Sequence, residues 1–291
     1  MNKETTSATS SPAGQSGQKQ DRIEISRRHF GKAALAASAG FILPKTLLAA
    51  GASTAPRARV VPSAATNIVL VHGAFADGTS WSRVIPILEA KGFNISAVQN
   101  PLTSLPEDVA TTRRLLAKQS GPTIVVGHSY AGFVITQAGN EPSVAGLVYI
   151  SSYGPAEGES HDDAVKRFPP AAGIPNIHLD EGGFLLIARD KFQETFCHDV
   201  DAPQARIMAT VQKPLAKKCF AAPIEGAPAW KSKPSWFLIS TEDRLINPDL
   251  QRFMANRMGA TVATAPSSHA SLVSHPVEAA NLIIEAASHI S

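Results

Sequence analysis

The sequence contains few residues that bind metals or form cross-links. Only two of its 291 residues are cysteines, and neither Cys197 nor Cys219 lies in a CxxC motif or beside a histidine at zinc-ligand spacing. We therefore expect no metal site. The two cysteines leave two alternatives open, which are a disulfide in an oxidising compartment or two separate buried thiols.

Long apolar runs are missing as well. The apolar stretch near the N-terminus, residues 33–43, is far shorter than the roughly 20 residues that span a bilayer. It follows a polar segment (residues 1–20) and the pair Arg27 and Arg28, and it precedes a small-x-small site at residues 50–52. This order resembles a twin-arginine export signal. We expect residues 1–52 to be a leader that engages the export machinery, with a periplasmic or secreted product that has no stable membrane anchor.

An excess of positive charge is absent once the leader is set apart. Residues 1–52 contain seven lysines and arginines against three acidic residues, and the whole chain has a net charge of +3, so the remainder is near −1. A protein with this balance lacks the basic surface that nucleic acids require. We therefore expect no nucleic-acid partner.

After a linker at residues 53–66, short β-branched runs alternate with helical patterns, which predicts a parallel α/β sheet. The expected strands are 67–71, 94–98, 123–126, 146–150, 235–240 and 261–265, and the expected helices are 81–91, 106–119, 129–138, 248–258 and 277–287. Residues 152–232 are too many for a simple connection. We predict that they form a cap over one end of the sheet.

The stretch with the clearest chemistry is residues 125–132, Val-Val-Gly-His-Ser-Tyr-Ala-Gly. It places Ser129 between small residues, after a predicted strand and before a predicted helix, as in a nucleophile elbow. The small neighbours are needed because this turn is strained and brings its flanks close together. Since a serine alone is a weak nucleophile, a base, an acid and an oxyanion site must accompany it.

Three further segments supply these parts. Residues 69–75 form a strand and a glycine turn whose backbone N–H groups can face an oxyanion, together with the N–H of Tyr130. Asp243 follows a buried strand, and His269 follows the last strand. The order Ser129, Asp243, His269 is that of the α/β-hydrolase fold. Ser129 would attack a carbonyl carbon, His269 would take and return its proton, and Asp243 would orient the imidazole.

Other residues compete for these roles. Glu242 is an alternative acid, because a slip of one residue at a strand end reverses the direction of a side chain. Among the histidines, we predict that His128 packs behind the elbow and that His72, in the oxyanion turn, makes a structural hydrogen bond. His275 precedes a proline and is expected to help start the last helix.

From about residue 67 to its end, the chain resembles the α/β-hydrolase superfamily, and within it the small esterases related to plant methyl esterases and hydroxynitrile lyases. The motifs that carry the resemblance lie at residues 72–75, 127–130, 148–150, 234–236, 242–244, 246–248 and 268–271. The resemblance implies a mostly parallel sheet of about six strands, flanked by helices and covered by a helical cap. It also implies Ser129, Asp243 and His269 as the catalytic triad, with Ala74 and Tyr130 as oxyanion donors and Phe75 as the weaker candidate.

The chain departs from this family at two positions. Ala131 stands where the elbow commonly has glycine, but it is small and Gly132 follows, so we expect the turn to form. Ala270 stands where the lyase relatives place a lysine that holds cyanide, which disfavours lyase chemistry.

We therefore predict a serine esterase that cleaves carboxylic esters of small molecules through an acyl-enzyme on Ser129, without a cofactor. The alternatives are a hydroxynitrile-lyase-like C–C lyase and a non-catalytic small-molecule receptor on the same fold. The candidates for lining the substrate pocket are aromatic, namely Trp81, Tyr130, Tyr153, Phe184 and Trp230.

Overall fold

The structure is a computed structural model that describes residues 66–290. The leader predicted at residues 1–52, and nearly all of the linker predicted at 53–66, lie outside the described residues. No helix in the described part of the chain has the length and apolar character needed to cross a membrane.

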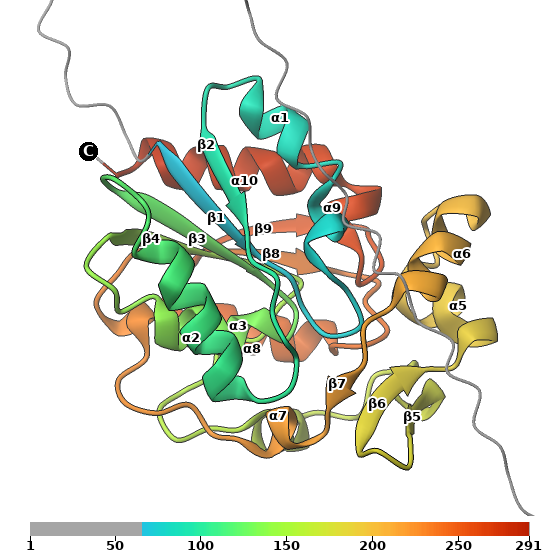
Figure 1. Cartoon of the computed structure of the whole chain (residues 1–291). Helices are drawn as coiled ribbons and strands as arrows, with labels where there is room; N and C mark the ends of the chain where they lie inside the picture. Colours follow the sequence, from blue (N-terminus) through green and yellow to red (C-terminus); the bar gives the residue numbers. More distant parts are fainter. Residues whose placement is uncertain (1–65, 291) are drawn as a thin grey trace, which may run out of the picture. The chain divides into compact units, whose positions relative to one another are not determined.

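A six-stranded parallel sheet forms the centre of the described residues (Figure 1). Its strands, in chain order, are β1 (Asn67–Val71), β2 (Asn94–Ala97), β3 (Thr123–His128), β4 (Val144–Ile150), β8 (Ser235–Ser240) and β9 (Thr261–Ala265). They lie side by side in the order β2-β1-β3-β4-β8-β9. The inner strands are buried along almost their whole length, as parallel sheets covered on both faces are. The α/β-hydrolase fold predicted from the sequence is confirmed.

Helices cover both faces of this sheet (Figure 1). On one face lie α1 (Ile85–Glu89) and α10 (Pro276–Ser288), and on the other lie α2 (Leu105–Leu116), α3 (Ala131–Ala138) and α8 (Pro248–Met258). A short helix, α9 (Ser271–Ser274), directly precedes α10. The helix predicted at 81–91 is wrong in extent, because a 3-10 turn, η1 (Gly78–Trp81), precedes the shorter α1. Pro86 explains the difference, since a proline fits the first turn of a helix but not its interior.

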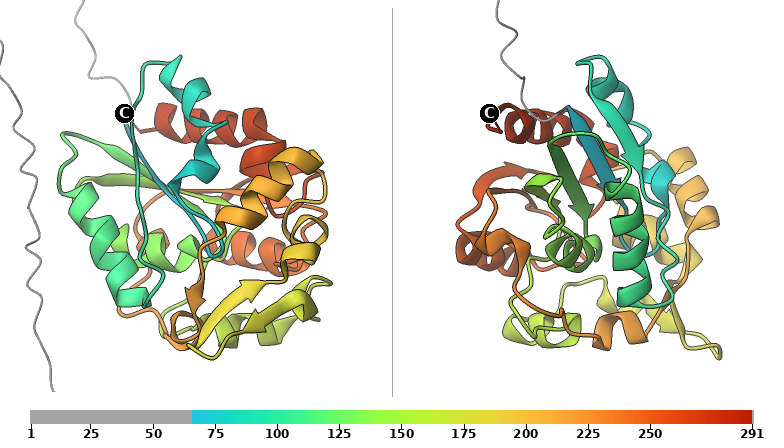
Figure 2. Two further views of the ribbon diagram at one scale, coloured as in Figure 1. Left: turned by 45° about the vertical axis from the view of Figure 1, so that its right-hand side comes forward. Right: turned by 60° about the vertical axis from the view of Figure 1, so that its left-hand side comes forward.

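The cap lies between β4 and β8 and differs from the purely helical prediction. Its helical pieces are α4 (His161–Ala164), η2 (Val165–Arg167), η3 (Ile174–Asn176), η4 (Arg189–Lys191), α5 (Phe192–Phe196), α6 (Ala202–Val211), α7 (Lys218–Ala221) and η5 (Ala229–Lys231). It also holds an antiparallel sheet of β5 (Ile177–Leu179), β6 (Phe184–Ile187) and β7 (Leu215–Ala216), seen beside α5 and α7 in Figure 2. The turn between β5 and β6 has Gly183 at φ 82°, and Asp180 accepts a hydrogen bond from the N–H of Phe184. This pattern of acidic residue and glycines is a hairpin signal.

Both cysteines are free and buried in the cap, Cys197 just after α5 and Cys219 in α7. Burial raises the pKa of each thiol to about 12. Of the two alternatives that the sequence leaves open, the structure has the separate buried thiols.

Candidate active site

Ser129 occupies a strained turn between β3 and α3. Its φ is 57°, in the left-handed region that costs a non-glycine residue on the order of 1–3 kcal/mol. The flanks of the turn are tightly packed: a Cβ on Gly132 would lie 1.9 Å from the carbonyl oxygen of Tyr153, and one on Gly127 would lie 2.9 Å from Cδ1 of Ile135. Ala131 is buried at the position where the elbow commonly has glycine. Gly132 is thus the glycine that this elbow requires on its helix side.

The carboxylate and the imidazole predicted from the sequence lie in contact. Nδ1 of His269 is 2.8 Å from Oδ2 of Asp243, and both side chains are fully buried. Because an ionised carboxylate only accepts hydrogen bonds, Nδ1 carries the proton and Nε2 is left as a base. Glu242, the alternative acid, is exposed, and its hydrogen bonds in the described residues come from its backbone: its carbonyl oxygen accepts from His198 and its N–H donates to Ser267.

Three more groups hold the carboxylate of Asp243. The backbone N–H groups of Leu245 and Ile246 donate to its Oδ1, at 2.8 and 2.9 Å. Nε2 of Gln251 donates to Oδ2 at 2.9 Å, while Oε1 of the same amide accepts from the N–H of Ser240. Sequence reasoning missed Gln251. The signal was a polar residue on the buried face of α8, which needs a polar partner there.

The elbow and the loop of His269 are joined through His128. Nε2 of His128 donates to the carbonyl oxygen of His269 at 2.9 Å, and the two rings lie 4.8 Å apart. Burial, followed by the nearby His269, holds the pKa of His128 well below its usual value, so the ring is neutral. Among the described residues, no hydrogen bond joins the hydroxyl of Ser129 to the imidazole of His269. Such contacts often tighten only when substrate binds.

His72 and His275, the other two histidines considered from the sequence, lie at structural positions. His72 donates from Nδ1 to the carbonyl oxygen of Gly73, and its Nε2 accepts from the N–H of Asn100. Burial lowers its pKa to about 4. The structural hydrogen bond predicted for His72 is therefore present. His275 is the residue before α10, as expected, but its side chain makes no capping hydrogen bond.

The turn after β1 lies directly against the elbow. A Cβ on Gly73 would be 2.7 Å from Cβ of Ser129, so only glycine allows this approach. Within residues 66–290, the backbone N–H groups of Ala74 and Tyr130 have no hydrogen-bond partner, and the same holds for Phe75. Ala74, Phe75 and Tyr130 all line the cavity at Ser129, so the donors predicted at Ala74 and Tyr130 are available to an oxyanion.

The side chain of Tyr130 has its own buried partner. Its hydroxyl donates to Oδ2 of Asp108 at 2.9 Å, and Oδ1 of Asp108 accepts from the N–H of Leu102. Burial raises the pKa of Asp108 to about 6. This pair fixes the residue that follows the nucleophile.

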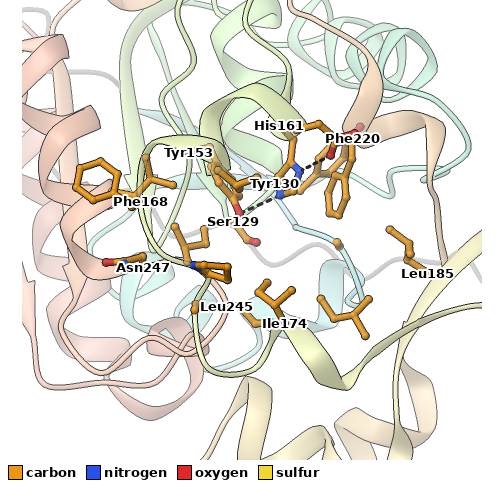
Figure 3. Close-up of a pocket in the computed structure, with 18 of the residues that line it drawn as sticks. Ser129, Tyr130, Tyr153, His161, Phe168, Ile174, Leu185, Phe220, Leu245 and Asn247 are labelled. Atoms are coloured by element: carbon orange, nitrogen blue, oxygen red, sulfur yellow. Dashed lines mark hydrogen bonds and ion pairs between the residues drawn. The ribbon is translucent and has the colours of Figure 1, made fainter.

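A cavity of about 410 Å³ opens above Ser129 (Figure 3). Of the five aromatic residues predicted to line it, only Tyr130 and Tyr153 do. The prediction is wrong for Trp81, Phe184 and Trp230: the ring of Trp81 packs against His128, and the indole of Trp230 donates to the carbonyl oxygen of Pro155. The lining instead includes four cap residues that sequence reasoning missed, namely Phe168, Ile174, Leu185 and Phe220. Across residues 66–290, no cluster of three or more histidine, cysteine or acidic side chains is placed to bind a metal ion.

A family model and known proteins match most of this chain. The model of the "Alpha/beta hydrolase family" matches residues 68–282. A pyrethroid hydrolase from Sphingobium wenxiniae is 27% identical over 246 residues, which cover 76% of this chain and 87% of that protein.

Two solved structures share the fold. A pyrethroid hydrolase from Sphingobium faniae JZ-2 has a TM-score of 0.67 and 23% identity, and the match covers 77% of this chain and 97% of that one. The methylesterase MES16 from Arabidopsis has a TM-score of 0.64 and 17% identity, and the match covers 77% of this chain and 99% of that one. The resemblance to small esterases and plant methyl esterases is thus matched by structure.

Proposed function

The chain belongs to the alpha/beta hydrolase family, and on that premise we propose that it hydrolyses carboxylic esters of small molecules through an acyl-enzyme on Ser129. The observation that carries the proposal is the buried Asp243–His269 pair, joined through His128 to a serine in a strained left-handed turn. Relatives named as pyrethroid hydrolase and carbendazim hydrolyzing esterase support ester hydrolysis as the reaction class.

In the first half-reaction, Oγ of Ser129 attacks the ester carbonyl while Nε2 of His269 takes its proton. The negative charge moves to the carbonyl oxygen, which the N–H groups of Ala74 and Tyr130 stabilise. When this intermediate collapses, the C–O bond to the alcohol breaks, and His269 returns the proton to the leaving oxygen.

In the second half-reaction, water takes the place of the alcohol. His269 removes a proton from the water while its oxygen attacks the acyl carbon. On collapse the bond to Oγ of Ser129 breaks, His269 returns the proton to Oγ, and the carboxylic acid leaves. Asp243 stabilises the imidazolium in both halves, and Gln251 with two backbone N–H groups keeps that carboxylate in place.

The cavity favours uncharged substrates. Apolar side chains from the cap, such as Phe168 and Leu185, form much of its lining. Burying a charged group against them would be costly, whereas an apolar acyl or alcohol group gains from leaving water.

The decisive experiment measures hydrolysis of a series of 4-nitrophenyl esters by wild type and Ser129→Ala. We expect the variant to lose at least about 10³-fold in kcat, since removing a nucleophile leaves only the other parts of the site. Ser143→Ala is the matched control, because within residues 66–290 that hydroxyl hydrogen-bonds only to the carbonyl oxygen of Leu116, away from the cavity lining. If Ser129→Ala turned over esters as fast as wild type, the proposal would be wrong.

Labelling with a fluorophosphonate separates the two alternatives. An esterase is labelled at Ser129, and the label is lost in Ser129→Ala. A receptor with an inactive site would bind small molecules but resist the reagent. A lyase would release cyanide from a cyanohydrin, which we do not expect because Ala270 is a small, buried apolar residue beside His269.

For residues 1–52, we propose export by the twin-arginine route. Replacing Arg27 and Arg28 by lysines should leave the protein in the cytoplasm, which fractionation of a bacterial host would detect. Unchanged export of this variant would contradict the proposal.

A further inference from the structure

One polar pair, with Tyr153 buried and His161 mostly buried, lies in the wall of the largely apolar cavity. The hydroxyl of Tyr153 is 3.1 Å from Nε2 of His161, and Nδ1 of His161 is 3.3 Å from Oδ1 of Asp162 (Figure 3). Tyr153 and His161 both line the cavity that holds Ser129. Neither residue takes part in the proposed reaction.

The remaining polar side chains of the cavity wall are either exposed to solvent or hydrogen-bonded to other groups. Lys217 is exposed, and the side chain of Asp162 is half exposed. The amide of Asn247 donates to the carbonyl oxygen of Pro169 and accepts from the N–H of Asp249. The hydroxyl of Tyr130 is bonded to Asp108. Beyond Ser129 and the oxyanion donors, Tyr153 and His161 are therefore the polar side chains of the cavity wall that are left to meet a ligand.

The ring of His161 is held in one orientation. It stacks on Phe220 of α7 at a centroid distance of 3.7 Å and an angle of 14°, and it meets Tyr153 edge-on at 5.0 Å. A side chain fixed in this way is typical of a preorganised binding group.

The direction of the hydrogen bonds follows from the chemistry of the groups. The carboxylate of Asp162 only accepts, so Nδ1 of His161 carries the ring proton. Burial lowers the pKa of His161, so the imidazole is neutral and its Nε2 accepts. The phenolic proton of Tyr153 is therefore donated to His161, and its oxygen offers the cavity a lone pair.

We propose that Tyr153 is a specificity-determining hydrogen-bond acceptor, and that the preferred substrates are uncharged esters whose apolar group carries a hydroxyl donor. This inference rests on the proposed function, because it names the substrate class for the same site. An ester with only an acceptor at that position would have to draw the phenolic proton away, which would leave Nε2 of His161 unpaired. An ester without any polar group would leave the lone pair unmatched.

The test compares esters that differ in one substituent. Two series are needed, one with an arylpropanoyl acyl group and one with a 2-arylethyl alcohol group, each with hydrogen, 3- or 4-hydroxy, and 3- or 4-methoxy on the ring. In the series that places the ring in the cavity, we expect kcat/KM for one hydroxy ester to exceed that of the hydrogen and methoxy esters about ten-fold. Equal values for all substituents in both series would overturn the inference.

Two variants separate the hydrogen bond from simple packing. Tyr153→Phe should bring the ratio of hydroxy to unsubstituted ester close to one. His161→Phe keeps a ring against Phe220 but frees the phenolic proton, so Tyr153 becomes a donor and the preference should move to the methoxy ester. A purely structural role for His161 would not reverse the preference.

The matched control is Tyr149→Phe, which removes a buried hydroxyl that bonds to Thr136 outside the cavity. In this variant, the ratio of kcat/KM for the hydroxy ester to that for the unsubstituted ester should equal the wild-type ratio. If a cavity variant fails to fold, calorimetry of the hydroxy and unsubstituted esters binding to Ser129→Ala tests the same preference, and equal affinities would overturn the inference.

The outcomes distinguish this inference from the proposed function. If unsubstituted esters are hydrolysed in a Ser129-dependent manner without any hydroxyl preference, the inference fails and the proposed function stands. If no ester is hydrolysed and Ser129 resists the fluorophosphonate, both fail.

Discussion

The floor and the roof of the cavity are built in different ways. The floor consists of Ala74, Ser129 and Tyr130, which line the cavity, together with the buried pair of Asp243 and His269. These residues follow the ends of parallel strands or enter the helix behind the elbow. The buried carboxylate of Asp243 accepts four hydrogen bonds.

The roof consists of Phe168, Ile174, Leu185 and Phe220, which belong to short pieces of the cap and contribute apolar surface. A change in the floor should therefore alter the rate of the chemical step, whereas a change in the roof should alter which molecules fit.

The largest effect expected in the floor is that of Asp243→Asn. The amide would place a donor toward Nδ1 of His269 and favour the wrong tautomer, so we expect kcat to fall about 10⁴-fold. Steady-state kinetics with a nitrophenyl ester measures this loss. Glu242→Gln is the matched control, because that carboxylate is exposed, and a comparable loss there would mean that the acid is misassigned.

The next effect concerns the close packing beneath the elbow. In Gly132→Ala, the new methyl group would lie 1.9 Å from the carbonyl oxygen of Tyr153, so backbone must move. We expect a loss of about 3 kcal/mol in the free energy of unfolding, measured with urea. Ala131→Gly should cost at most about 1 kcal/mol. Equal stability of Gly132→Ala and wild type would contradict the tight contact.

Buried titratable groups next to the floor should also make stability depend on pH. His72 has a pKa of about 4 when folded, against an ordinary value of 6.5, because burial disfavours its charged form. Its contribution is fully present above pH 6.5 and is lost as the pH falls toward 4, by about 3 kcal/mol in all. His128 acts in the same direction, whereas Asp108, with its raised pKa, destabilises the fold as the pH rises through about 6.

Urea unfolding at pH 7 and pH 4.5 measures this dependence. The difference between the two values should be smaller in His72→Gln than in wild type, because glutamine has no charge to gain. The same difference in both proteins would show that His72 is not held neutral.

The smallest effect is expected in the roof. Phe168→Ala removes apolar surface from the cavity, so we expect KM for an aryl ester to rise about five-fold with kcat nearly unchanged. Phe184→Ala, in the cap but outside the lining, is the control and should leave KM as it is. A loss confined to kcat in Phe168→Ala would contradict the division between floor and roof.

The same division explains what could be predicted from sequence. Strand ends and the elbow have local signatures, because a strained turn needs small neighbours and a strand-end carboxylate needs a fixed position. Residues 127–132, Asp243 and His269 were therefore recognisable before the structure, and the sheet was predicted almost strand for strand. Gln251 was within reach, as a polar residue on the buried face of α8.

The roof was harder to predict for a physical reason. Its elements are short, so no periodic pattern extends far enough to indicate which side chains face inward. Aromatic character alone was a poor guide, since Trp81 packs beneath the site and Trp230 bonds to backbone. Two local features of the fold did have sequence signals. Pro86 marks the first turn of α1, and Asp180 marks the hairpin between β5 and β6.

The separate thiols of Cys197 and Cys219 have a consequence for where the polypeptide can mature. No covalent bridge has to be made, and with a pKa of about 12 neither sulfur is ionised at neutral pH. The described residues can thus reach their final form in a reducing cytosol, with no oxidant or isomerase, which is the condition for a cargo that crosses a membrane already folded.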